Sequence, residues 1–112
     1  MKVYALKNCD TCRKAVKDLQ AARDDVEVVD IRADGLPKAA IAHIVGAVGW
    51  EQALNRRSTT WRALDDPDKD ALDDVKAVNL IAAHPTLMKR PAVVDGDRVT
   101  VGWKDDAKEV WL

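Results

Sequence analysis

The sequence predicts an α/β domain built on a mixed four-stranded sheet, with a block of helices inserted in its middle. Two observations indicate this class. A strand, a helix and a second strand follow one another near the N-terminus, and two strands joined by Asp95-Gly96-Asp97 precede a closing helix. A strand–helix–strand unit pairs its strands in parallel, whereas a short Asp-Gly turn joins antiparallel strands. One sheet therefore contains both orientations.

The first strand–helix–strand unit follows from hydrophobic periodicity. Residues 3–6 and 26–31 are short apolar runs bounded by charged residues, and they predict strands. Between them, apolar or small side chains recur every three or four positions, which predicts a helix that opens at residues 8–11. These side chains are Cys12, Ala15, Val16, Leu19 and Ala22.

A helical block and a final β-β-α unit complete the chain. Pro37 suits the first position of a helix, and a stripe with helical spacing follows it over residues 40–48. Residues 51–64 predict shorter helical pieces. Asp66-Pro67 predicts another helix start, and His84-Pro85 predicts the end of the block. Residues 92–94 and 98–101 predict the hairpin, and residues 104–112 the closing helix.

With the helical block set aside, the order β-α-β and then β-β-α is the plan of the thioredoxin-like fold. We therefore expect one domain over residues 1–112, in which a thioredoxin-like core carries a helical insertion at about residues 37–83. The length agrees, because domains commonly span about 100–150 residues.

Composition narrows the classes of partner. The 18 Lys and Arg residues balance 19 Asp and Glu residues, so the net charge of −1 gives no strong attraction for nucleic acid or anionic lipid. No apolar run reaches the length of a membrane span, the N-terminal run is too short for a signal peptide, and two cysteines are few for a secreted disulfide scaffold. We expect a cytoplasmic monomer that contacts neither nucleic acid nor membrane directly.

Two cysteines lie where the first strand meets the first helix, in Cys9-Asp-Thr-Cys12. Their spacing puts both thiols on nearly the same side of the helix start, where backbone N–H groups lower the pKa of a thiol from about 8.5. Lys7 and Arg13 are expected to add positive charge there, and Asp10 to oppose it. The pair can cycle between dithiol and disulfide. Cys9 is therefore a candidate redox cysteine, and Cys12 is either its resolving thiol or a packing residue.

A zinc site is the other chemistry that a C-x-x-C pair suggests. Only His43 and His84 are obvious ligands to complete it, and the sequence contains no second C-x-x-C and no H-x-x-x-H. We therefore expect no bound metal.

Lys89-Arg90-Pro91 directly precedes the third predicted strand. In thioredoxin-like folds a cis-proline stands at this place and faces the reactive cysteine, so we expect a cis bond before Pro91. Arg90 would then be directed toward Cys9, where a guanidinium can bind an oxyanion or a carboxylate. In the helical block, Arg57 is a candidate for further positive charge near this site.

Four strings of the sequence resemble the arsenate reductase (ArsC)/Spx superfamily, and within it the YffB-like branch. They are residues 4–15, 34–36, 54–64 and 84–91, and they cover the chain from end to end. The resemblance implies the thioredoxin-like fold and thiol chemistry linked to glutathione or glutaredoxin, with glutathione as a co-substrate and no bound cofactor. It places Cys9 on the family's nucleophile. The candidate residues for binding substrate or glutathione are Lys7, Asn8, Arg57, Arg90 and Pro91.

The resemblance to the arsenate reductases themselves is incomplete. Arg90 falls on one arginine of the arsenate-binding set, but Asn55 stands where the arginine of the insertion would be. Val101 or Gly102 stands where the arginine of the last hairpin would be. A tetrahedral dianion needs several fixed cations, so arsenate reduction is disfavoured. Cys12 is a departure toward Spx, whose C-x-x-C is a redox switch on a protein that binds RNA polymerase.

The leading hypothesis is a small thiol-redox enzyme, a glutathione-dependent thiol reductase. In this enzyme Cys9 attacks a disulfide, Arg90 assists, and Cys12 or glutathione resolves the intermediate. The first alternative is an Spx-like redox-responsive regulator that binds the α subunit of RNA polymerase. The second is a glutaredoxin-dependent arsenate reductase.

Overall fold

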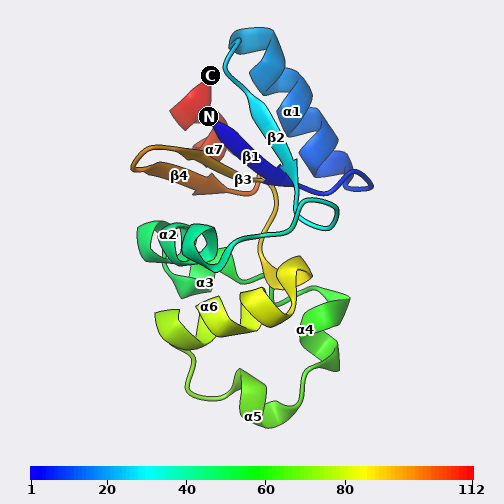
Figure 1. The fold of residues 1–112 in the computed structure, drawn as a ribbon, viewed down its shortest axis with the longest axis vertical. Helices are drawn as coiled ribbons and strands as arrows, with labels where there is room; N and C mark the ends of the chain where they lie inside the picture. Colours follow the sequence, from blue (N-terminus) through cyan, green and yellow to red (C-terminus); the bar gives the residue numbers. More distant parts are fainter. The chain divides into compact units, whose positions relative to one another are not determined.

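The computed structural model describes residues 1–112, and the chain divides into two compact units (Figure 1). One unit joins Met1–Gly35 to Arg90–Leu112 and contains the sheet. The other unit spans Leu36–Lys89 and is helical, and the residues expected to form the insertion, 37–83, lie within it.

The first unit is built on a mixed four-stranded sheet in the order β2-β1-β3-β4. β1 (Lys2–Ala5) pairs in parallel with β2 (Glu27–Asp30). β3 (Ala92–Asp95) runs antiparallel both to β1 and to β4 (Arg98–Val101). The predicted fold class is therefore confirmed, with the parallel unit and the antiparallel hairpin in one sheet.

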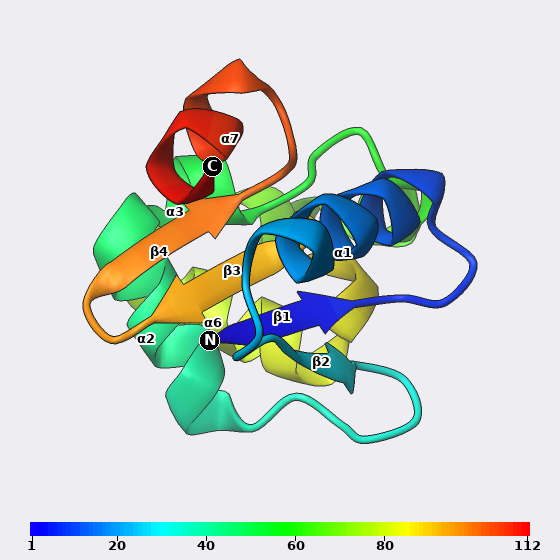
Figure 2. The ribbon, with the colours of Figure 1, turned by 90° about the horizontal axis from the view of Figure 1, so that it is seen from above.

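Two helices lie on the same face of this sheet, as Figure 2 shows: α1 (Asp10–Ala22) and α7 (Asp105–Trp111). The buried residues of α1 are three or four positions apart, so one stripe of the helix faces the strands. The core between helices and sheet consists of Val3, Ala5, Cys12, Ala15, Leu19, Val93, Trp103, Ala107 and Trp111. Cys12 is therefore a core residue as well as part of the C-x-x-C motif.

Hydrogen bonds hold the two core tryptophans in place. The indole N–H of Trp103 donates to the carboxylate of Asp18 on α1 at 3.0 Å, and that of Trp111 donates to the hydroxyl of Thr100 on β4 at 2.7 Å. An indole N–H buried without an acceptor would cost free energy. These bonds therefore let two large polar-tipped side chains fill the core, and they link α1 to the segment after β4 and α7 to β4.

β2 forms one edge of the sheet, and the turn that follows covers the end of that edge. The N–H groups of Glu27 and Ile31 donate toward β1, so the backbone of Asp30 faces outward. The carboxylate of Asp34 accepts from the Asp30 N–H at 3.1 Å, and the Asp34 N–H donates to the Asp30 carbonyl at 2.8 Å. This turn blocks strand pairing there, which is a common protection for an exposed edge.

Asp30 is expected to make this turn sensitive to acid. Its carboxylate accepts hydrogen bonds from the N–H groups of Ala33 and Arg32, and these bonds, with the charge of Lys7, hold the pKa of Asp30 below its usual value. Because the pKa is lower in the folded chain, the ionised group stabilises the fold above about pH 4, and this contribution is lost as the pH falls through the folded-state pKa.

Urea unfolding of the wild type and Asp30→Ala at several pH values checks this expectation. The difference in unfolding free energy between the two should be largest near neutral pH and shrink below about pH 4. Asp24→Ala is a matched control, because Asp24 is exposed and follows α1 without capping a turn. A difference that stays constant down to pH 2 would contradict the role given to Asp30.

The second unit is a group of short helices. α2 (Lys38–Val48) packs against α6 (Asp74–Ala83), and their buried faces include Ile41, Ile44 and Ile81. The remaining segments are α3 (Trp50–Ala53), α4 (Thr59–Ala63), α5 (Asp66–Lys69) and the 3-10 turn η1 (Pro85–Leu87). No helix in either unit combines the length and the apolar character that crossing a membrane requires.

Helix starts in this unit differ from the predicted ones by one residue. Pro37 is the N-cap of α2 instead of its first residue. Asp65, not Asp66, precedes α5, and Pro67 is the second residue of that helix. Proline is tolerated throughout the first turn, where the N–H groups have no partner within the helix, so its presence marks a helix start only approximately.

Candidate functional site

Cys9 is the N-cap of α1, so its side chain lies where the first N–H groups of the helix point outward. Its backbone is extended, with φ −103° and ψ 116°, and its Sγ accepts a hydrogen bond from the N–H of Cys12 at 3.4 Å. Serine or aspartate oxygens usually fill this role. A sulfur at this position is stabilised as a thiolate by the N–H groups and by the positive end of the helix dipole.

The pKa of Cys9 lies below its ordinary value because several interactions outweigh the effect of burial. Partial burial raises the pKa, whereas the thiol and N–H of Cys12, the charge of Arg90 and the N–H of Thr11 lower it. Cys9 is half-buried and not part of a disulfide. The sulfur is therefore both activated and reachable, which a nucleophilic thiol requires.

Cys12 has the opposite environment. Its exposed fraction is 1%, and burial, followed by the hydrogen bond to Cys9 and the negative charge of the Cys9 thiolate, raises the pKa of Cys12 to about 12. Cys12 is therefore a protonated thiol at neutral pH. In this state it can donate to the Cys9 sulfur.

The segment before β3 brings Arg90 to the two cysteines. The Arg90–Pro91 peptide bond is cis, as predicted. The buried Pro91 is held by its carbonyl, which accepts from the N–H of Gly102 at 2.9 Å. Arg90 is half-buried, and its charge lowers the pKa of Cys9 and of Cys12. The first unit therefore brings Arg90 near Cys9 and Cys12 from a segment far away in the sequence, and Pro91 follows Arg90 through the cis bond.

The other cations near Cys9 in the sequence are directed elsewhere. The guanidinium of Arg13 forms an ion pair with Asp10 at 2.6 Å. Lys7 is exposed in the turn after β1, and its charge acts on Asp30. The expectation that Lys7 and Arg13 strengthen the field at Cys9 is thus replaced by a simpler arrangement, in which Arg90 provides the leading contribution from a charged side chain. Asn8, next to Lys7, is exposed as well.

Arg57 belongs to the second unit. Arg57 is exposed and lies in a turn, where its backbone N–H donates to the side-chain oxygen of Asn55 at 3.2 Å. Ser58, the next residue, caps α4. The neighbouring Arg56 lies over the ring of Trp50, 5.7 Å from its centroid. The first unit therefore carries the thiol site, and Arg57 stays a predicted binding residue of the helical unit.

The residues considered for a zinc site are also divided between the units. Both cysteines belong to the first unit, whereas His43 on α2 and His84 at the end of α6 belong to the second. No group of three or more His, Cys, Asp and Glu side chains is placed to hold a metal ion.

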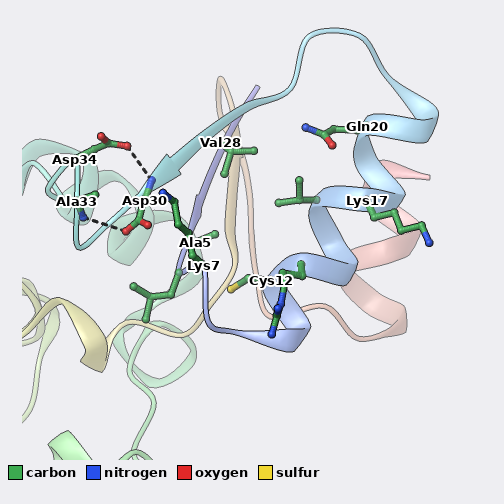
Figure 3. A pocket seen from close by; sticks show the side chains of 12 residues that line it. Ala5, Lys7, Cys12, Lys17, Gln20, Val28, Asp30, Ala33 and Asp34 are labelled. Carbon is green, nitrogen blue, oxygen red and sulfur yellow. Dashed lines mark hydrogen bonds between the residues drawn. The ribbon is translucent and has the colours of Figure 1, made fainter.

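A groove of about 630 Å³ runs along α1 beside β2, and sequence patterns did not reveal it (Figure 3). It arises because α1 leaves Val28 of the edge strand 43% exposed. Only the parallel register, which sets Val28 next to Val3, puts this side chain on the face that carries α1. Its lining comprises Ala5, Leu6, Lys7, Cys12, Arg13, Val16, Lys17, Gln20, Val28, Asp30, Ala33 and Asp34.

Strand order and the cis-proline before β3 place the first unit in the thioredoxin-like class. Within that class, the chain belongs to the ArsC family, whose family model matches residues 4–110.

Known proteins similar to this chain support the same assignment. An uncharacterized protein of Haemophilus influenzae is 38% identical over 103 residues, which cover 92% of this chain and 90% of that protein. The global transcriptional regulator Spx of Streptococcus mutans is 30% identical over 109 residues, which cover 94% of this chain and 77% of Spx.

Two solved structures are also similar to this chain. A protein named YffB has a TM-score of 0.90 with 36% identity, covering 99% of this chain and 97% of that one. An arsenate reductase (ArsC) related protein from Brucella melitensis has a TM-score of 0.73 with 33% identity, covering 98% and 92%. The predicted resemblance to the ArsC/Spx superfamily and its YffB-like branch is thus confirmed.

Proposed function

We propose that this protein is a glutathione-dependent thiol reductase with Cys9 as its nucleophile. The observation that carries the proposal is the environment of Cys9, a half-buried helix N-cap whose pKa is lowered by Cys12 and by Arg90. A thiolate in reach of a disulfide is what thiol–disulfide exchange needs. Membership of the ArsC family supports this class of chemistry.

The substrate of this reaction is a mixed disulfide between glutathione and a second thiol. The Cys9 thiolate attacks the glutathionyl sulfur, a Cys9–glutathione disulfide forms, and the original S–S bond breaks. The second thiol leaves as a thiolate and takes a proton from water. Arg90, half-buried beside Cys9, binds a carboxylate of the glutathionyl group. Pro91, Lys7, Asn8 and Arg57 are the further candidates for holding this group.

Glutathione then regenerates the enzyme. A second glutathione thiolate attacks the glutathionyl sulfur on Cys9, which yields oxidised glutathione and the free Cys9 thiolate. In total, one mixed disulfide and one glutathione become one thiol and one oxidised glutathione, so the two electrons are balanced. In this scheme Cys12 donates a hydrogen bond to Cys9, because its thiol is buried and its pKa is raised to about 12.

An assay with the mixed disulfide of glutathione and cysteamine tests the function. With glutathione present, the wild type should form oxidised glutathione faster than the uncatalysed exchange, and Cys9→Ser should return the rate to that background. Oxidised glutathione is measured through glutathione reductase and the consumption of NADPH. A wild-type rate equal to the background would refute the proposal.

A redox-responsive regulator is the second candidate, favoured by the relatives named global transcriptional regulator Spx. It would bind the RNA polymerase α subunit in a manner that depends on a Cys9–Cys12 disulfide. A pull-down with the C-terminal domain of that subunit, in reduced and oxidised states, separates the two functions. The reductase proposal predicts no binding that changes with the redox state.

A further inference from the structure

The groove along α1 is lined by charged side chains of both signs around an apolar floor. Val16 of α1 and Val28 of β2 provide apolar surface, and Val28 is 43% exposed. The carboxylates of Asp30 and Asp34 lie on the β2 side, and the exposed Lys17 lies on the α1 side, with its amino group directed away from β2 in Figure 3. Binding sites commonly combine such an apolar lining with a few fixed polar groups.

The length of the groove fits a short stretch of extended polypeptide. On α1 the lining runs from Cys12 to Gln20, which is about 12 Å at the rise of an α-helix. A chain in extended conformation rises about 3.3 Å per residue, so about four residues cover this distance. The opposite charges on the two walls favour a segment that carries one basic and one acidic side chain.

One end of the groove is linked to the sulfur of Cys9 through Cys12. Cys12 lines the groove at its Lys7 and Arg13 end, and its N–H donates to the Sγ of Cys9 at 3.4 Å. Lys7 is close enough to Asp30 for its charge to act on that carboxylate, so Asp30 and Asp34 stand at this end. Lys17 lies further along the helix.

Two basic side chains that line the groove differ in whether an acidic residue of the protein already pairs with them. Arg13 is already paired with Asp10 at 2.6 Å, whereas Lys17 forms no ion pair. Asp34 is held by the N–H of Asp30 at 3.1 Å, which orients its carboxylate without neutralising it. The same bond covers the outward N–H of Asp30, so at this residue a ligand binds through its side chains instead of pairing with the strand.

We propose that this groove binds the polypeptide half of a glutathionylated protein, while Arg90 and Pro91 receive the glutathionyl half. The inference rests on the proposed reductase function and names its substrate class. Running away from the disulfide cysteine, the segment presents a basic residue to Asp30 and Asp34, then an apolar residue to Val16 and Val28, and then an acidic residue to Lys17.

Two glutathionylated peptides of identical composition test this substrate class. The first is acetyl-Cys-Lys-Val-Ala-Glu-amide, and the second exchanges its Lys and Glu. The wild type should reduce the first with a kcat/KM about fivefold higher, since two partly exposed charge pairs change from attractive to repulsive. Lys17→Glu should remove this preference, and the matched control Lys14→Glu, exposed on the same helix and outside the groove, should retain it.

Equal kcat/KM values for the two peptides, or equal effects of Lys17→Glu and Lys14→Glu, would overturn the inference. Binding of the first peptide, with Ser in place of its Cys and no glutathione, gives a readout that does not require turnover. On titration into the wild type, backbone amide signals of residues 12–20 and 28–34 should shift. Such shifts without any turnover of the cysteamine substrate would refute the reductase function alone, and turnover without them would refute the groove alone.

Discussion

Oxidised glutathione is expected to add one glutathionyl group to the wild type and to Cys12→Ser, and none to Cys9→Ser. The two thiols differ sharply, because Cys9 is half-buried with a lowered pKa, whereas Cys12 is 1% exposed with its pKa raised to about 12. Of the two thiols, only Cys9 is both accessible and lowered in pKa, so it carries the larger thiolate fraction. Intact-protein mass spectrometry after brief exposure, with the reaction quenched by acid, measures the adduct.

The amount of adduct in the wild type decides the role of Cys12. Accumulation only in Cys12→Ser would mean that Cys12 attacks the intermediate, leaves a Cys9–Cys12 disulfide in the wild type, and is the resolving thiol. That outcome would contradict the scheme in which glutathione resolves. Cys12→Ala serves as the companion variant, because it lacks the side-chain donor that serine retains. Alkylation of Cys9 near neutral pH should therefore slow in Cys12→Ala more than in Cys12→Ser.

Arg90→Met is expected to have the second large effect. Removing the guanidinium raises the pKa of Cys9, because the charge of Arg90 is among the interactions that lower it. It also removes the proposed partner of the glutathione carboxylate. A hydrogen bond to a charged group typically contributes about 1.5–3 kcal/mol, so kcat/KM for the glutathione–cysteamine disulfide should fall about tenfold or more.

Two further variants separate charge and geometry at this position. Arg90→Lys keeps the positive charge, so it should leave the pKa of Cys9 nearer to its wild-type value than Arg90→Met does. Arg13→Met is the matched control, since Arg13 is also near Cys9 in the sequence but pairs with Asp10. Equal losses of kcat/KM in Arg13→Met and Arg90→Met would contradict a specific role for Arg90.

Local patterns predicted the elements of the first unit closely. The Asp-Gly turn with Gly96 at φ 61° joins β3 to β4, and the strand–helix–strand order produces parallel pairing of β1 and β2. Both depend on short-range backbone preferences. Contacts between distant residues were not predictable in the same way. The bridge between Leu54 and Met88 and the bond from the Trp103 indole to Asp18 depend on how the chain packs.

The candidate site also combines features that local sequence predicts with features that depend on packing. Cys9 was predictable because an N-cap position and the C-x-x-C spacing are local, and Arg90 because a single proline marks its place before β3. The contrast between the thiols depends on burial, which only the packed core sets. The groove beside β2 depends on the register of the sheet and on the path of α1, so its charged walls had no sequence signal.

The rate at which iodoacetamide alkylates Cys9, followed from about pH 5 to pH 10, tests whether Cys9 is an activated thiol. The thiolate alone reacts, so the rate rises with pH through the pKa of Cys9 and then becomes constant. Cys12→Ser limits the signal to one thiol, and the same variant unfolded in urea gives the reference. We expect a midpoint for the folded protein clearly below that of the unfolded chain. Coincident midpoints would mean that Cys9 is an ordinary thiol, and the proposed function would fail with it.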